Sequence, residues 1–191
     1  MTIDAGEVLD FWFDPAHARY WFVASQAFDS RIRQHFGAAV EAARDGRLDE
    51  WAKVASGWLA LLILLDQFPR NIHRGTPHAW AGDVAAQRFA LSGIARGDDR
   101  QLSAQQRVFA YLPLEHAEHS ALQQRSVCLF EALAAEVGSA ERKQFAGYLD
   151  YARQHRDVIA RFGRFPHRNA VLGRACTPEE VEYLAEPGAG F

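Results

Sequence analysis

The sequence predicts an all-α fold of eight or nine helices, arranged as antiparallel pairs around one core. Apolar residues recur at helical spacing, as in the stripe formed by Phe28, Ile32, Phe36 and Val40. The alternation of apolar and polar residues that is typical of strands is missing. Helix-start and helix-stop signals also follow one another closely, so the connections are short. Because no linker or low-complexity segment interrupts the 191 residues, we expect a single domain over 1–191.

Four helices are predicted in the first half of the chain. Asp14-Pro15 closes the first, and Gly46 ends the second. The third is apolar nearly all round and is therefore expected at the centre of the fold. Thr76-Pro77 starts the fourth, since threonine caps a helix and a proline in the first position has no amide hydrogen to leave unpaired. These predicted helices cover about 8–12, 28–45, 51–67 and 77–96.

The second half carries two capping boxes, in which a Ser or Thr is followed three residues later by Glu or Gln. Ser103 with Gln106 starts a fifth helix, and Thr177 with Glu180 starts the last one. Pro113 is expected to kink or restart the chain, because proline removes a helical hydrogen bond. The helices predicted here cover 104–111, about 114–137, 139–162 and a short segment from 178.

Composition excludes several classes of protein. A formal charge of −3 and a pI near 6.2 argue against a nucleic-acid binder, which usually carries a basic surplus. The longest apolar run, WLALLILL at 58–65, is far shorter than the ~20 residues that span a bilayer. The first ten residues, MTIDAGEVLD, are acidic where a signal peptide is basic and then apolar. Two cysteines provide no disulfide framework, so we expect a cytoplasmic protein with no membrane partner.

The chain repeats one motif, FPRN at 68–71 and FPHRN at 165–169. Proline disfavours helical geometry in the residue before it, so Phe68 and Phe165 are expected to be extended where their helices end. Asn71 and Asn169 are expected to bind the last helical carbonyls or to adopt left-handed geometry. Each motif therefore predicts a turn at a helix C-terminus.

Cationic side chains crowd both turns and leave two interpretations open. Between Tyr151 and Ala175 there are six arginines and two histidines, and the only carboxylate is Asp157. The glutamates of 179–186 are able to neutralise this block through internal salt bridges. Alternatively, the two turns approach one another and bind an anionic small molecule or an acidic peptide end. The ligand-binding residues predicted by the second interpretation are Arg70, Asn71, Arg74, Arg164, His167, Arg168 and Asn169.

Three segments give the chain a family resemblance. LLDQFPRNIHRGTPHAW at 64–80, YLPLEHAE at 111–118, and RFGRFPHRN at 161–169 followed by LGR at 172–174 resemble the bacterial family called domain of unknown function 924. The resemblance implies a helical fold of the tetratricopeptide-like superfamily, a right-handed stack of helix pairs with a concave face. It implies no activity. The matching motif members are Asp66, Gln67, Phe68, Pro69, Arg70, Asn71, Arg74, His116, Glu118, Arg161, Arg164, His167, Arg168 and Asn169.

Two other function classes remain open. In a small hydrolase or transferase, His116 with Glu118, or Asp66, would transfer protons on an anionic substrate. In a protein-interaction scaffold, suggested only by the tetratricopeptide-like resemblance, a groove would bind a partner protein. Oligomeric state is not predicted.

The sequence gives little evidence for a metal site or for a reactive cysteine. His116 and His119 are spaced for a shared ion, but the second Glu-x-x-His of a helical di-metal site is missing, so no metal or cofactor is expected. Cys128 lies in an apolar helical run and is expected in the core, whereas Cys176 is expected in a loop. The tryptophans and phenylalanines are expected mostly in the core, with a groove lined by Trp12, Trp21 and Phe22 as the alternative.

Overall fold

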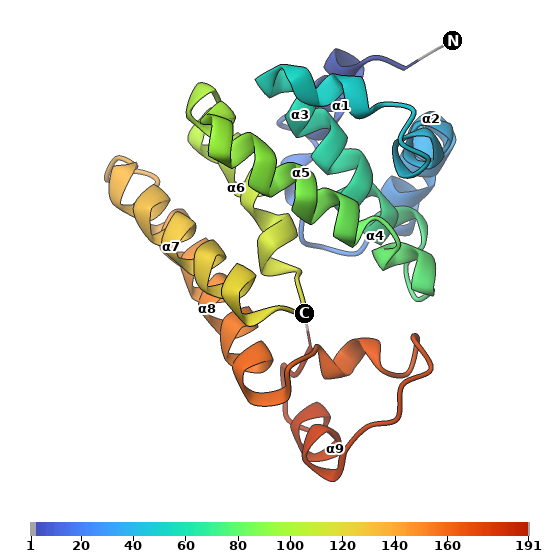
Figure 1. Cartoon of the computed structure of the whole chain (residues 1–191), viewed down its shortest axis with the longest axis vertical. Helices are drawn as coiled ribbons and strands as arrows, with labels where there is room; N and C mark the ends of the chain where they lie inside the picture. Colours follow the sequence, from blue (N-terminus) through green and yellow to red (C-terminus); the bar gives the residue numbers. More distant parts are fainter. Residues whose placement is uncertain (1–2, 191) are drawn as a thin grey trace. The chain divides into compact units, whose positions relative to one another are not determined.

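A computed structural model describes residues 3–190, and every regular element in that range is helical. The predicted all-α class is therefore confirmed (Figure 1). The chain forms two compact units: unit 1 takes Met1–Arg74 and His78–Pro113, and unit 2 takes Gly75–Pro77 and Leu114–Phe191. The right-handed stacking of helix pairs that the resemblance implies stays a prediction. No helix among the described residues combines the length and the apolar character needed to cross a membrane.

Unit 1 is built around α3, a helix in which seven of the eight residues are buried. This helix packs against both α1 and α5, while α2 packs against α4. The central position predicted for this apolar segment is therefore confirmed. The elements that lie in unit 1 wholly or for the most part are α1 (Ala5–Trp12), η1 (Ala18–Tyr20), α2 (Gln26–Arg44), η2 (Asp49–Lys53), α3 (Ala55–Leu62), η3 (Ile63–Gln67), α4 (Phe68–Ile72), η4 (Pro77–Trp80), α5 (Asp83–Arg96), η5 (Asp98–Gln101) and α6 (Ala104–Glu115).

Aromatic side chains fill the core of unit 1. The ring of Trp12 lies 5.5 Å from that of Phe68 and 5.5 Å from that of Phe109, in edge-to-face geometry that aromatic pairs prefer. Trp58 is also fully buried, and its indole Nε1 donates to the carbonyl of Phe89 at 2.7 Å. The stripe that begins at Phe28 is buried as predicted.

The first Phe-Pro segment is not a turn. α3, η3 and α4 form one continuous helix, and Phe68 is helical with φ −60° and ψ −39°. The prediction of extended geometry for Phe68 is therefore wrong. In an α-helix the ring of Pro69 would clash with the carbonyl four residues earlier. The wide π-turn of η3, in which Phe68 N donates to Ile63 O, precedes the proline and relieves that crowding.

Asn71 also departs from its predicted role. It lies inside α4, and no described residue other than glycine has a positive φ. Gly82, just before α5, lies so close to the carbonyl oxygen of Leu65 in η3 that a Cβ would fall well inside van der Waals distance. The π-turn is thus packed against a position where only glycine fits.

Proline 113 does not restart the chain. α6 begins with the predicted capping box of Ser103 and Gln106 and continues through Pro113 to Glu115. The break comes after Glu115, where Gln123 of α7 (Ser120–Glu136) donates to the carbonyls of Glu115 at 2.5 Å and Ala117 at 2.8 Å. These bonds satisfy carbonyls that a helix leaves unpaired at its C-terminus. α5 likewise starts at Asp83, later than predicted, because a 3₁₀ turn follows Thr76-Pro77.

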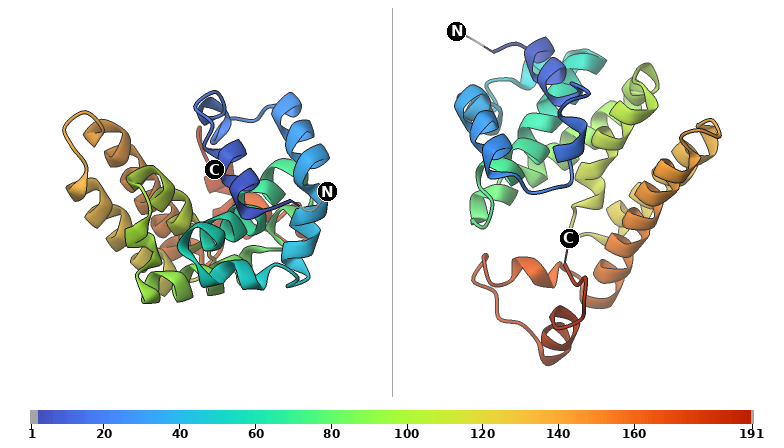
Figure 2. Two further views of the ribbon diagram at one scale, coloured as in Figure 1. Left: turned by 90° about the horizontal axis from the view of Figure 1, so that it is seen from above. Right: turned by 180° about the vertical axis from the view of Figure 1, so that it is seen from behind.

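Unit 2 consists of an antiparallel helix pair followed by a C-terminal loop and a short helix. α7 (Ser120–Glu136) and α8 (Arg142–Phe162) lie side by side in every view (Figure 1, Figure 2). Gly163 closes α8 with φ 71°, and Phe165 is extended as predicted, with φ −89° and ψ 107°. The 3₁₀ turn η6 (Pro166–Arg168) then packs against α9 (Pro178–Leu184), whose predicted capping box is present.

Candidate functional site

Arg70, the first of the predicted ligand-binding arginines, lies between two carboxylates of unit 1. Its Nη1 is 3.0 Å from Asp66 Oδ1, and its two terminal nitrogens donate to Asp83 at 3.0 and 3.1 Å. Burial lowers the pKa of Arg70, but the charges of Asp66 and Asp83 outweigh burial and raise it overall. Arg70 is thus a structural cation, and Asp66 is 1% exposed, out of reach of a substrate.

Asn71 and Arg74 both bind Asp29 of α2. Asn71 Nδ2 donates to Oδ1 at 2.7 Å, and Arg74 Nε donates to Oδ2 at 3.0 Å. Three carboxylates therefore face the two arginines of this segment. An anion would have to displace those carboxylates, so the contacts around the first motif favour the salt-bridge interpretation.

Just before the second motif, in unit 2, two arginines form internal ion pairs. Arg164 binds Glu180 of α9 in bidentate geometry at 2.7 and 2.8 Å, and Asn169 Nδ2 donates to the same carboxylate at 3.2 Å. These hydrogen bonds, Arg164 first, lower the pKa of Glu180 to about 2. Arg161 Nε also pairs with Glu179 Oε1 at 2.8 Å. The contacts of both arginines therefore support the salt-bridge interpretation.

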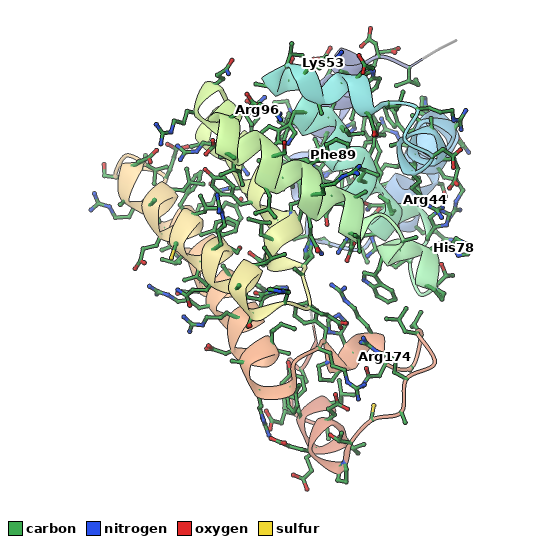
Figure 3. All side chains as sticks on the ribbon, in the orientation of Figure 1. Arg44, Lys53, His78, Phe89, Arg96 and Arg174 are labelled. Atoms are coloured by element: carbon green, nitrogen blue, oxygen red, sulfur yellow. The ribbon has the colours of Figure 1, made fainter. Side chains whose placement is uncertain are left out.

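Glu118 ties the start of the second motif to the loop that follows it. It accepts from Phe165 N at 2.8 Å and from both terminal nitrogens of Arg174 at 2.6 and 2.9 Å. Figure 3 shows Arg174 on the loop between η6 and α9. Burial raises the pKa of Glu118, but the bonds from Arg174 and Phe165 outweigh burial and lower it. A carboxylate that stays ionised in this way is a poor proton acceptor at neutral pH.

The remaining residues of the motif gather around one aromatic ring. The ring of Phe165 lies 5.6 Å from that of His155 and 5.6 Å from that of His167, and the guanidinium carbon of Arg168 lies 4.6 Å above it. The ring of His116 is 6.2 Å from that of His155, and Arg168 Nη2 donates to the His116 carbonyl at 3.0 Å. We call these five residues the Phe165 cluster.

Burial and nearby charges keep two imidazoles of the Phe165 cluster, those of His155 and His167, in the neutral form. The pKa of His155 is lowered to about 3, first by burial and then by His116. The pKa of His167 is lowered to about 4, first by burial and then by Arg168. Glu115 Oε1 lies 3.3 Å from His155 Nδ1. At neutral pH His155 and His167 are therefore uncharged, and Arg168 supplies positive charge beside them.

Other predicted chemistry finds less support. Among residues 3–190, no group of three His, Cys, Asp or Glu side chains has the geometry to hold a metal. His119 is exposed and caps α7 only through its backbone position. Cys128 is exposed on α7, so its predicted place in the core is wrong: it lies on the outer face of the helix, beside buried Val127. Cys176 is exposed in the loop before α9, as predicted.

Two residues of the candidate site, His155 and Arg174, were not predicted from the sequence. His155 lies in the middle of α8, with no neighbouring motif to mark it, and only the fold brings it next to His116 and Phe165. Arg174 belongs to the LGR segment that carries the family resemblance, and this position could have marked it as a candidate. Its partner Glu118 is 56 residues away and could not be inferred from the sequence. Whether the two Phe-Pro segments share an opening stays a prediction, since each lies in a different unit.

Comparison with known proteins places this arrangement in a family. The family model described as "Bacterial protein of unknown function (DUF924)" matches residues 8–188. The chain belongs to this family. A solved structure, "Structure of Protein of Unknown Function ATU0120 from Agrobacterium tumefaciens", is 45% identical and superimposes with a TM-score of 0.85, covering 96% of this chain and 97% of that one. A search of curated proteins finds no match. DUF924 membership thus confirms the resemblance and assigns no activity.

Proposed function

We propose that unit 2 binds an anionic group, carried by a small molecule or an acidic peptide end, at the Phe165 cluster. The observation that carries this proposal is the guanidinium of Arg168 stacked on Phe165, whose ring also contacts the imidazoles of His155 and His167. Arg168 is only 6% exposed. In such a partly dehydrated place a guanidinium attracts a carboxylate or phosphate more strongly than it does in water.

The positive potential supports the same location. Arg168 contributes to the lowered pKa of both His155 and His167. A bound anion would oppose that effect, so the histidines would take up protons more easily when the site is filled. His116 and His167 are half-buried and therefore reach both the cluster and solvent. Their imidazole N–H groups are suitable donors to an oxyanion.

Titration of histidine ring resonances by NMR tests the proposal, with inorganic phosphate, sulfate and an acetylated Asp-Glu peptide as probes. We expect saturation with a Kd below about 1 mM, equivalent to about 4 kcal/mol, and a rise in the pKa of His167. Arg168→Gln should abolish both effects. Arg156→Gln is the matched control, since Arg156 is only partly buried and its ion pair within residues 3–190 is with exposed Asp157. Absence of saturation with all three probes, or equal loss in both variants, would refute the proposal.

The half-buried imidazole of His116 favours one second candidate, a hydrolase or transferase for anionic substrates. Glu118 and Asp66 are held in ion pairs, so His116 is the proton-transfer residue best exposed to a substrate. A panel of phosphate and carboxylate esters tests this role. Turnover that is lost in His116→Ala supports catalysis, and a panel without turnover leaves binding as the function.

A further inference from the structure

A concavity of about 400 Å³ lies on unit 1, where α1 ends near the first turn of α6. It is lined by Leu9, Asp10, Phe13, Asp14, Pro15 and Gln106. None of the predicted ligand-binding residues is among these six. The view from behind in Figure 2 shows α1 and the loop after it in front of the other helices of unit 1. The volume is at the small end of the range for binding pockets, sufficient for one or two side chains.

Aromatic rings continue the apolar lining of this concavity. Phe13 lies 5.4 Å from Phe109 and 5.9 Å from Trp21 in edge-to-face contacts. Phe22 stacks on the same Phe109 ring at 6.0 Å, and its side chain is 58% exposed. Trp12 is buried in the core, whereas Trp21 and Phe22 extend towards the surface. Exposed aromatic surface of this kind is typical of contact sites for other molecules.

Two carboxylates, those of Asp10 and Asp14, belong to the lining of the concavity. The first eighteen residues contain Asp4, Glu7, Asp10 and Asp14 and no lysine or arginine. Asp4 and Glu7 form the capping box of α1, and Asp14 accepts from Ala16 N at 2.8 Å. The Asp10 carboxylate forms no hydrogen bond or ion pair with any residue in the described range. Two exposed carboxylates at the concavity, Asp10 and Asp14, therefore lack an ion-pair partner in that range.

We infer that this concavity docks a basic amphipathic segment of another protein, with one apolar side chain beside Leu9 and Phe13 and a lysine or arginine beside Asp10 and Asp14. Charge complementarity selects this occupant, because an acidic segment would be repelled and a neutral apolar one would leave both carboxylates without a partner. The interaction is expected to weaken as salt is added, since exposed charges are screened. It is independent of anion binding at the Phe165 cluster.

Fluorescence anisotropy with two labelled model peptides tests the inference. One is an amphipathic helix of leucine and lysine, and the other has glutamate in place of each lysine. We expect binding of the leucine–lysine peptide only. Asp10→Asn combined with Asp14→Asn should raise its Kd about 3- to 10-fold, as expected for the loss of two exposed ion pairs. Leu9→Gln should weaken binding as well, because Leu9 lines the concavity.

Glu182→Gln combined with Glu186→Gln is the matched control, since both residues are exposed and the net charge changes equally. Equal weakening by the two double variants would mean general attraction to an acidic protein and would overturn the inference. Unchanged binding by Leu9→Gln would do the same. A dimer in gel filtration that Leu9→Gln dissociates would assign the surface to a second copy of the chain instead. Arg168→Gln is expected to leave peptide binding unchanged.

Discussion

Acidification from pH 7 to pH 5 is expected to destabilise the protein through its buried histidines. His155 is 6% exposed, and its pKa is about 3 in the folded protein. An unfolded histidine has a pKa of about 6.5. As the pH falls below 6.5, the unfolded chain binds a proton that the folded ring does not accept. The stabilisation is therefore complete above about pH 6.5 and is lost progressively as the pH falls towards 3.

The magnitude follows from the two pKa values. A pH of 5 lies about 1.5 units below the pKa of the unfolded ring, which is therefore protonated, whereas the folded ring is still neutral. For His155 this difference lowers the free energy of unfolding by about 2 kcal/mol. His167, with a folded pKa of about 4, is expected to add a similar loss. The carboxylates with lowered pKa values, Glu118 and Glu180, lose their stabilisation only at lower pH, so the window from pH 7 to pH 5 isolates the histidines.

Urea unfolding followed by tryptophan fluorescence at pH 7, 6 and 5 measures this effect. His155→Gln should reduce the loss of unfolding free energy between pH 7 and pH 5 by about 2 kcal/mol relative to the unmodified chain. His119→Gln controls for removal of an exposed histidine. Identical pH dependence in His155→Gln and the unmodified chain would refute the assignment of His155 as a buried neutral ring.

The remaining predictions concern packing and capping, each measured by urea or thermal unfolding. Arg70→Ala should destabilise by about 3–5 kcal/mol, because it leaves two buried carboxylates without their cation; a loss below about 1 kcal/mol would contradict the buried pairing. Gly82→Ala should destabilise by about 1–3 kcal/mol through its clash with the Leu65 carbonyl. Gly37→Ala, in an open position of α2, should instead stabilise by about 0.5–1 kcal/mol. Thr177→Ala should lose about 1 kcal/mol with the capping box of α9.

Features determined by neighbouring residues were predictable from the sequence, and features determined by distant ones were not. The capping boxes at Ser103 and Thr177 were predicted because they need only four consecutive residues. The helical geometry of Phe68 was not predicted, because proline statistics favour an extended residue and the π-turn that accommodates Pro69 is stabilised by packing.

The same distinction applies to the candidate site. The residue types of the second motif indicated anion chemistry, but their partners were invisible, since Glu118 lies 56 residues from Arg174. The cluster of glutamates in 179–186 suggested internal salt bridges, and one of its members, Glu180, is the partner of Arg164. Cys128 was expected in the core because its neighbours are apolar. An apolar stretch predicts a helix, but a single position in that helix can still face solvent.

The π-turn of η3 has a consequence for the length of the helix that contains it. One additional residue in a helical turn rotates every later side chain by about 100° around the axis. The run from Leu59 to Pro69 is buried at successive positions because α1, α2 and α5 pack around this helix, so the rotation determines which neighbour each side chain after η3 faces. Deleting one residue from Ile63–Gln67 would reverse that rotation and turn Arg70 and Asn71 away from Asp83 and Asp29. This stretch of the gene is therefore expected to accept substitutions far more readily than changes in its number of codons.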